Sequence, residues 1–171
     1  MSRTLPGTLP AMTAAPQVTP SDLDRGAQAR LATVDQRYTA NRRLLVEILS
    51  GAERPLTMPE LLEEGDGLAQ SSVYRNLVVL EQAGVVRRIV TGDEFARFEL
   101  AEDLTGHHHH HLVCSSCGSV EDVTVPEEIE ELFDATLGRV AARHGFVVDG
   151  HRLDLLGSCR ECRQRERRSE A

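Results

Sequence analysis

The stretch GHHHHHLVCSSCG, residues 106–118, places five consecutive histidines directly before a Cys-x-x-Cys pair. A purification tag would sit at a terminus, whereas this run is internal and continues into an apolar stretch typical of a strand. Side chains on a strand alternate between its two faces. His109 and His111 therefore share one face, and His108 and His110 share the other. The pattern predicts two distinct metal-binding faces on one strand rather than a solvated polar run.

A second Cys-x-x-Cys pair, Cys159 and Cys162, follows far along the chain and matches the first, Cys114 and Cys117. In a cytosolic protein, paired motifs of this kind favour zinc over disulfides. Structural Zn²⁺ takes four ligands in a tetrahedron, and each motif supplies two thiolates from one tight turn, which Gly118 helps to form. We therefore predict a structural zinc site in preference to unrelated thiols or a redox pair.

Upstream of the histidines, helix signals precede hairpin signals. Thr57 followed by Glu60 forms a capping box, and Gly84 ends an apolar helical pattern. The expected elements are helices after Thr39 to about Gly51, after Thr57 to about Gly65 and over 69–83, then strands over 85–90 and 95–100 joined by a turn at 91–94. Three helices followed by a hairpin are typical of a winged helix-turn-helix.

The downstream half alternates strands and a helix, so the whole chain is predicted to be α+β. We expect a strand at 120–125, a helix from Pro126 to about His144 and a strand at 146–156. The expected organisation is a disordered arm at 1–20, a winged-helix DNA-binding domain at 21–100 that starts with a short helix over 21–34, a hinge at 101–106, a small α/β metal-binding dimerisation domain at 107–163 and a charged, frayed tail at 164–171.

The net charge and the hydropathy pattern of the chain restrict the classes of function that it can have. The chain has 171 residues and a formal net charge of −8, which argues mildly against nucleic-acid binding unless basic residues gather locally. Arg37, Arg42 and Arg43 do gather near one predicted helix, and Arg75 lies on another. No apolar stretch is long enough to cross a membrane, and no secretory signal is recognisable, so we expect a cytoplasmic protein without a membrane partner.

Several motifs in this order resemble the ferric uptake regulator family: Ser72–Leu77 (SVYRNL), Phe98–Leu100, the histidine run with its LVCSSCG continuation, His151, and Gly157–Cys162 (GSCREC). The resemblance covers about residues 35–163. It implies a homodimeric transcriptional repressor with an N-terminal winged-helix domain and a C-terminal α/β dimerisation domain. It also implies that metal binding promotes binding to a palindromic operator in double-stranded DNA.

The resemblance also implies roles for individual residues. Cys114, Cys117, Cys159 and Cys162 match the structural zinc ligands. Glu99, His109 and His111 match a regulatory metal site between the two domains. A further metal site within the dimerisation domain is matched by His108, His110, Glu130 and His151, with Asp122 at an acidic position that is a ligand in some members. Glu127 or Glu128 could substitute for Glu130.

Two departures from the family pattern leave the regulatory metal open. Iron- and peroxide-responsive members often carry a histidine where this chain has Arg54-Pro55-Leu56, and zinc-responsive members often carry a cysteine, which residues 98–106 lack. The hinge offers Glu102 and Asp103 as extra oxygen ligands. Two imidazoles with carboxylates suit Fe²⁺, Mn²⁺, Zn²⁺, Ni²⁺ or Co²⁺. The absence of a thiolate favours Fe²⁺ as the second divalent metal, with Zn²⁺, nickel, manganese or peroxide sensing as alternatives.

A recognition helix reads the major groove with its N-terminal part. The candidates on the third helix are Gln70, Ser71, Ser72, Tyr74 and Arg75, and those for phosphate contacts are Arg37, Arg42 and Arg43. The alternative for this helix is that Tyr74 is half-buried core and Arg75 a solvated residue. Because Glu99 ends one domain while the histidines begin the other, a cation held by both would set the angle between the domains.

Two other function classes fit the sequence less well. A zinc deaminase needs a His-x-Glu signature and an open zinc position. The histidine run leads into Leu112 without such a glutamate, and four thiolates would close their site, so we do not expect an enzyme. A zinc-stabilised interaction module without DNA binding is the other class, and the winged-helix pattern argues against it.

Overall fold

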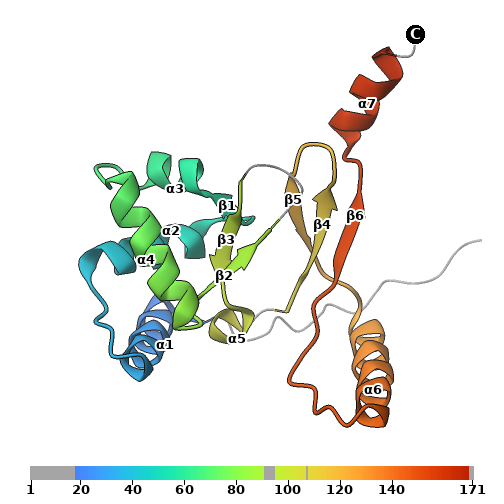
Figure 1. Ribbon diagram of the computed structural model, residues 1–171, viewed down its shortest axis with the longest axis horizontal. Helices are drawn as coiled ribbons and strands as arrows, with labels where there is room; N and C mark the ends of the chain where they lie inside the picture. Colours follow the sequence, from blue (N-terminus) through green and yellow to red (C-terminus); the bar gives the residue numbers. More distant parts are fainter. Residues whose placement is uncertain (1–17, 91–94, 107, 170–171) are drawn as a thin grey trace, which may run out of the picture.

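The computed structural model describes residues 18–90, 95–106 and 108–169, which form two lobes joined through a short helix (Figure 1). The first lobe contains α1 (Pro20–Thr33), α2 (Ala40–Gly51), β1 (Leu56–Thr57), α3 (Met58–Glu64), α4 (Gln70–Gln82), β2 (Val86–Ile89) and β3 (Arg97–Leu100). The connecting helix is α5 (Glu102–Thr105), and the second lobe contains β4 (His110–Cys114), β5 (Val120–Val123), α6 (Glu127–Arg143), β6 (Asp154–Gly157) and α7 (Arg160–Ser169).

The first lobe has the predicted order of three helices and a hairpin, preceded by α1. The hairpin strands β2 and β3 pair antiparallel, and β1 completes a sheet of order β1-β3-β2. Periodicity missed β1 because two residues are too few to show an alternation. Gly84 ends α4 with a φ of +68°, a backbone conformation that glycine adopts without steric cost. The predicted turn at 91–94 lies outside the described residues.

Apolar side chains from all the first-lobe helices meet in one core. Leu31, Leu45, Leu61, Leu77 and Leu80 are each completely or almost completely buried. They come from α1, α2, α3 and α4, so the helices pack around a single cluster that the sheet closes from one side. This core fixes the position of β3, which carries Glu99.

The predicted capping box of α3 is present. Thr57 Oγ1 accepts from the Glu60 N–H, and Glu60 Oε2 accepts from the Thr57 N–H at 2.7 Å. Glu60 also accepts from Arg54 at 2.5 Å, and this hydrogen bond lowers the pKa of Glu60 from 4.5 to about 2. One carboxylate therefore both caps the helix and pairs with the segment before it.

We predict that Glu60→Gln destabilises the protein by about 1 kcal/mol at neutral pH, because the charged cap and the pairing with Arg54 are lost. A carboxyl whose folded pKa is depressed stabilises above its unfolded pKa, and that contribution is lost as pH falls through the folded value. The difference from wild type should therefore shrink between about pH 5 and pH 3. Urea unfolding over this range measures it, with Glu63→Gln on the exposed side of α3 as control. A difference independent of pH would contradict the assignment.

The expected disordered arm at 1–20 is wrong at its C-terminal end. Residues 1–17 lie outside the described residues, but Thr19 caps α1 and forms a capping box with Asp22. The expected helix over 21–34 is confirmed as α1, and its buried Leu23, Ala27 and Leu31 pack into the first-lobe core. The segment that begins at Thr19 thus belongs to the winged-helix lobe.

The expected hinge at 101–106 is wrong in that most of it is helical, as α5. Leu104 is buried in the first-lobe core. The Arg30 guanidinium on α1 donates to both carboxylate oxygens of Asp103, at 3.1 and 2.7 Å, and to the Gly84 carbonyl. A β-carbon added at Gly26 would lie 2.5 Å from Leu104. These contacts attach α5 to the first lobe, so the residues up to Thr105 belong to that lobe.

The second lobe is a three-stranded sheet of order β5-β4-β6 with α6 beside it (Figure 1). The strand β4 pairs antiparallel with β5 and parallel with β6. The expected strand at 146–156 is wrong for most of its length, because only Asp154–Gly157 reaches a partner strand. The expected frayed tail is also wrong as far as Ser169, because residues 160–169 form α7, which carries an Arg165–Glu161 pair one turn apart.

Within residues 18–90, 95–106 and 108–169, none of the helices combines the length and the apolar character needed to cross a bilayer.

Candidate metal centres and DNA-facing helix

The four cysteines come together at one end of the second lobe, where β4 ends and α7 begins. Their sulfur atoms all lie within 4.8 Å of one another, and none forms a disulfide. Gly118 follows the first pair with a φ of +70°, as its predicted role in the turn requires. The predicted set of four is thus brought together completely.

The cysteine cluster has the electrostatics of a cation site. The backbone N–H of Cys159 donates to Cys114 Sγ at 3.3 Å and lowers the pKa of Cys114 to about 6. Hydrogen bonding to the neighbouring sulfur of Cys159 raises the pKa of Cys162 to about 12. Four sulfurs at this separation cannot all ionise unless a cation balances them, and four thiolates are the donor set of a closed zinc site.

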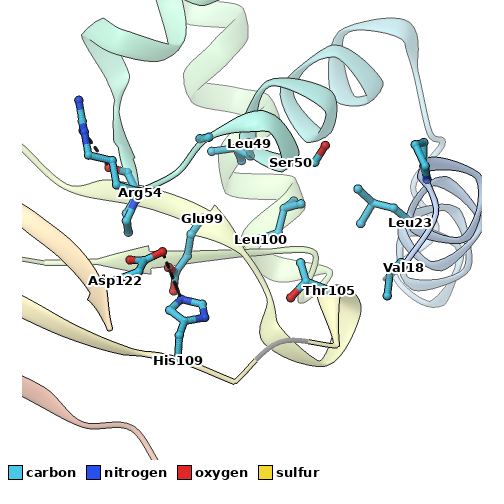
Figure 2. A pocket seen from close by; sticks show the side chains of 13 residues that line it. Val18, Leu23, Leu49, Ser50, Arg54, Glu99, Leu100, Thr105, His109 and Asp122 are labelled. Atoms are coloured by element: carbon cyan, nitrogen blue, oxygen red, sulfur yellow. Dashed lines mark hydrogen bonds and ion pairs between the residues drawn. The ribbon is translucent and has the colours of Figure 1, made fainter. Parts of the chain in front are cut away.

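A second cluster lies between the lobes and combines Glu99, His109, His111 and Asp122. Glu99 comes from β3, the two histidines precede or lie on β4, and Asp122 lies on β5. Glu99 Oε2 lies 3.1 Å from Nε2 of both histidines. Figure 2 shows Glu99, His109 and Asp122 directed toward one another at the edge of a pocket of about 450 Å³ between the lobes.

The charges of this interlobe cluster are arranged for a cation. Burial opposes ionisation of Glu99, but hydrogen bonds from His109 and His111 and the charge of Arg87 outweigh it, so its pKa lies well below the usual range. The hydrogen bond to Glu99 raises the pKa of His109. The Glu99 carboxylate is thus ionised, and one of its oxygens faces the imidazoles.

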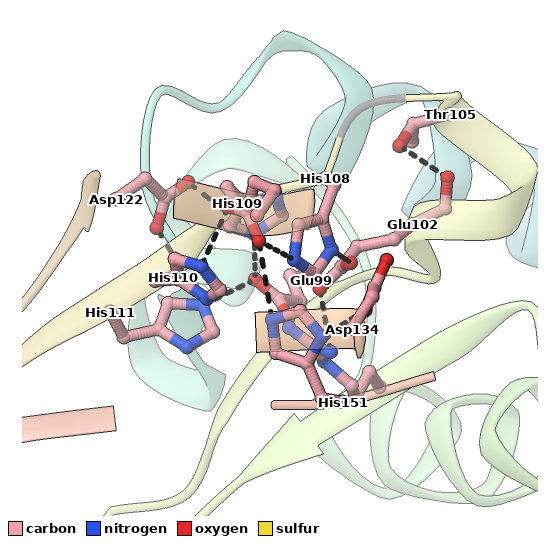
Figure 3. A network of polar contacts seen from close by, with 12 residues as sticks. Glu99, Glu102, Thr105, His108, His109, His110, His111, Asp122, Asp134 and His151 are labelled. Atoms are coloured by element: carbon pink, nitrogen blue, oxygen red, sulfur yellow. Dashed lines mark hydrogen bonds and ion pairs between the residues drawn. The ribbon is translucent and has the colours of Figure 1, made fainter. Parts of the chain in front are cut away.

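The third cluster combines His108, His110, Glu130 and His151 inside the second lobe (Figure 3). Among the described residues, three of its buried polar atoms have no hydrogen-bond partner: His110 Nδ1, Glu130 Oε2 and His151 Nε2. An unpartnered buried polar atom is costly, and each one needs an explanation. Glu130 Oε2 nevertheless lies 3.3 Å from His151 Nε2 and 3.4 Å from His108 Nε2, without forming a hydrogen bond to either. Imidazole and carboxylate donors that converge in this way fit a bound divalent cation.

The alternation predicted for the histidine run is confirmed in its consequence: His109 and His111 join one cluster, while His108 and His110 join the other. The expected place of Asp122 is wrong. Its carboxylate lies 3.9 Å from His109 and 3.8 Å from His111, so it completes the interlobe cluster instead of the third cluster. The antiparallel register, which pairs Asp122 with His111, puts it there.

Two carboxylates that sequence reasoning missed, Asp154 and Asp134, contact the Nδ1 atoms of His111 and His151. Asp154 lies 3.0 Å from His111 Nδ1, and Asp134 lies 3.0 Å from His151 Nδ1, which leaves each Nε2 toward its cluster. The spacing of Asp134, one helical turn after Glu130, was a usable signal. No sequence signal indicated Asp154, because its pairing with His111 exists only through the parallel β4–β6 register.

Among the described residues, none of the alternative ligands suggested by the sequence belongs to the interlobe cluster or the third cluster. Arg54, which lies where some family members carry a histidine, pairs with Glu60. Asp103 pairs with Arg30, whereas Glu102 contacts His108 at 2.6 Å. Glu127 and Glu128 are exposed in the first turn of α6, and neither belongs to a cluster of the described residues.

The N-terminal half of α4 presents an open polar face. Tyr74 is 59 % exposed and Arg75 is exposed, with its Nε donating to the Ser71 carbonyl at 3.0 Å. Gln70, Ser71, Tyr74 and Arg75 line one shallow depression together with Met58. The alternative of a half-buried Tyr74 therefore does not describe this helix.

The phosphate-anchor candidates differ in environment. Arg37 is exposed. Arg43 pairs with Asp24 and lies over the Tyr38 ring at 4.5 Å. The expectation for Arg42 is wrong. Its buried guanidinium donates to the Arg37 carbonyl, Gln36 and Asn76, and so ties α2 to α4. Ser72 is also tied into this contact, since Asn41 and Asn76 both donate to its hydroxyl.

Comparison with known proteins decides the family. The sequence profile of the "Ferric uptake regulator family" matches residues 33–156, which include β4 with its histidines and the first cysteine pair. The chain is a member of the ferric uptake regulator family. This Fur-family chain is 30 % identical over 136 residues to the peroxide operon regulator of Bacillus subtilis, covering 76 % of this chain and 86 % of that protein.

Solved structures agree with this assignment. The ferric uptake regulator of Vibrio cholerae is 28 % identical, with a TM-score of 0.59 and coverage of 77 % of this chain and 98 % of that one. The Helicobacter pylori regulator, described as having three functional metal binding sites, has a TM-score of 0.66 at 22 % identity, with coverage of 87 % and 97 %, and so shows the shared fold.

The predicted family and fold class are confirmed: the protein is α+β, with an N-terminal winged-helix DNA-binding domain followed by an α/β dimerisation domain. As a Fur-family member it is a metal-dependent, DNA-binding transcriptional repressor.

Proposed function

We propose that a divalent cation, Fe²⁺ in preference to the other metals, binds Glu99, His109, His111 and Asp122 and thereby activates operator binding. The observation that carries this proposal is that the four ligands come from both lobes. Glu99 belongs to β3 of the winged-helix lobe, while the others belong to β4, β5 and the segment before β4 in the second lobe. Two imidazoles and two carboxylates, without a thiolate, are a donor set that suits Fe²⁺.

The mechanism follows from this division of ligands. A bound cation would supply positive charge at the point on which the two carboxylates and the two imidazoles converge. Glu99 moves with the first lobe, and His109 moves with the second, so holding both restricts the angle between the lobes. The four ligands would hold a cation together only in the arrangement in which they all meet, so binding would favour that arrangement over the others.

The cysteine cluster serves as the structural Zn²⁺ site, and the third cluster binds a further divalent cation. Zinc at the four cysteines joins the end of β4 to the start of α7, two segments far apart in sequence. The three orphaned atoms of the third cluster are the support for a cation there.

The protein acts as a homodimer that forms through the second lobe. Helix α6 has no buried residue, and β6 lies at the edge of its sheet. Apolar side chains left exposed on these elements and the segment between them are Ile129, Leu132, Leu137, Val140, Phe146, Val147, Val148, Leu155 and Leu156. An apolar face beside an open sheet edge fits a second copy of the same chain. Two winged-helix lobes related by a two-fold axis then match a palindromic operator in cytoplasmic DNA.

We predict that Arg75→Met weakens operator binding by about 1–3 kcal/mol, which is about fivefold to 150-fold, because an exposed arginine on the first turns of α4 reads a base edge or a phosphate. Fluorescence anisotropy with metal-loaded protein measures the change. Arg25→Met on α1 removes the same charge from an exposed site away from α4 and serves as control. Equal affinities for the two variants would exclude α4 as the reading helix.

The experiment for the proposed function combines metal analysis with DNA binding. The wild-type protein selects its operator from random duplexes in the presence of Fe²⁺, and binding is then measured at buffered Fe²⁺, Mn²⁺, Zn²⁺ and Ni²⁺. We expect one tightly held Zn²⁺ per chain and an affinity that rises with a second metal, at the lowest free concentration for Fe²⁺. A protein without zinc, or with operator binding indifferent to all four metals, would refute the proposal.

A peroxide-responsive repressor is the second candidate, which the similarity to the peroxide operon regulator favours. Bound iron would supply the redox chemistry, and peroxide would add one oxygen atom to the ring of His109 or His111 and leave as water. Mass spectrometry after peroxide treatment of the Fe²⁺-loaded protein should then find one added oxygen on either histidine, with Mn²⁺-loaded protein as control. Unmodified histidines at complete loss of DNA binding would exclude this candidate.

A further inference from the structure

A line of polar contacts joins the interlobe cluster to the third cluster. Arg87 on β2 donates its Nε to Glu99 Oε1 at 2.5 Å, and its Nη2 contacts the same oxygen. Its Nη1 lies 2.8 Å from Glu102 Oε1 on α5. Glu102 Oε2 in turn lies 2.6 Å from His108 Nδ1, as Figure 3 shows.

Each carboxylate in this line uses its two oxygens in opposite directions. Glu99 turns Oε1 toward Arg87 and Oε2 toward His109 and His111. Glu102 turns Oε1 toward Arg87 and Oε2 toward His108. His108 Nδ1 faces Glu102, so its Nε2 faces Glu130, 3.4 Å away in the third cluster. Neither cluster has to give up a ligand atom to keep the contact.

The part of the line formed by Arg87, Glu99 and Glu102 is largely shielded from water, whereas the His108 side chain at its end is 38 % exposed. The side chains of Arg87, Glu99 and Glu102 are 19 %, 9 % and 18 % exposed. Helix α5, which carries Glu102, is anchored to the first lobe by the pairing of Asp103 with Arg30. Charged hydrogen bonds are stronger when they are shielded, and two carboxylates share a single guanidinium here.

We infer that Arg87 and Glu102 are positioning residues that couple the two histidine–carboxylate clusters, so that a cation in one raises the affinity of the other. A cation at Glu99 orders its carboxylate and, through Arg87, orders Glu102 and the ring of His108. When a cation then enters the third cluster, these side chains are already ordered, so its binding loses less conformational entropy. By thermodynamic linkage the effect is reciprocal. This inference rests on the proposed function, since it requires that both clusters bind metal.

The test is a thermodynamic cycle with Co²⁺ on protein whose cysteine site is filled with Zn²⁺. Calorimetry gives the affinity of the interlobe cluster alone in His151→Ala and that of the third cluster alone in His109→Ala. The overall constant for two ions in wild type is compared with the product of these single-site constants. We expect it to exceed the product about fivefold or more.

The same cycle is repeated in an Arg87→Met background and in an Arg88→Met background. Arg88 is the exposed neighbour on the same strand, so its loss removes equal charge without touching either carboxylate. Arg87→Met should bring the overall constant to the product, while Arg88→Met keeps the excess. Glu102→Gln provides the same measurement if Arg87→Met does not fold, and the unfolding temperature of the metal-free variants reports any general loss of structure.

The outcomes are separable. Two Co²⁺ ions that bind independently in wild type, or an excess that survives in Arg87→Met and Glu102→Gln, overturn the coupling and leave the proposed function intact. Clusters that bind no Co²⁺ in wild type overturn the proposed function itself.

Discussion

A protein carrying Glu99→Gln is expected to bind its operator with the same weak affinity whether or not Fe²⁺ is present. Glu99 is the only member of the interlobe cluster that belongs to the winged-helix lobe. Its neutral amide removes the charge that balances the cation and leaves the second-lobe ligands unable to hold both lobes together. Loss of contacts behind a ligand already weakens metal binding by about 10–100-fold, so loss of a ligand charge should cost more.

Anisotropy titrations of operator DNA with and without buffered Fe²⁺ measure this effect. Glu121→Gln is the matched control, because Glu121 is exposed beside Asp122 on β5 and lies outside the cluster. His109→Ala should reproduce the Glu99→Gln result from the other lobe. A Glu99→Gln protein that still gains affinity with Fe²⁺ would show that the switch does not run through the junction of the lobes.

Replacing Cys114 with Ser is expected to abolish zinc binding and cooperative folding of the second lobe. Structural zinc contributes about 10–16 kcal/mol in small zinc domains at neutral pH, which exceeds the stability of most domains of this size. This lobe has little core of its own: α6 has no buried residue, and Val113, Cys114, Val120 and Cys162 are the apolar side chains buried in it, among its described residues. The variant should therefore also be monomeric.

Zinc content by native mass spectrometry and association by sedimentation equilibrium test the Cys114→Ser prediction. Ser116→Ala, in the exposed turn between Cys114 and Cys117, is the control. The first lobe should remain folded in the variant, since its core does not include the cysteines. A zinc-free Cys114→Ser protein that still dimerises with native circular dichroism would contradict the structural role of the site.

Local rules predicted much of this protein from the sequence. The Thr57–Glu60 capping box, the turn at Gly84 and the two Cys-x-x-Cys pairs each depend on residues a few positions apart, so their geometry follows from local backbone conformation. Strand alternation likewise separated His109 and His111 from His108 and His110 before any fold was available.

Contacts between distant segments were decided by the tertiary structure. Asp122 and Asp154 meet His111 through strand registers on both sides of β4, and a one-residue slip in either would turn the carboxylate to the other face. Arg42 has the sequence context of a DNA anchor, but helix packing buries it against Asn76. Arg87 contacts Glu99 and Glu102 only because β2, β3 and α5 are packed together. Sequence periodicity specifies which face a residue occupies, whereas packing specifies which residue it meets there.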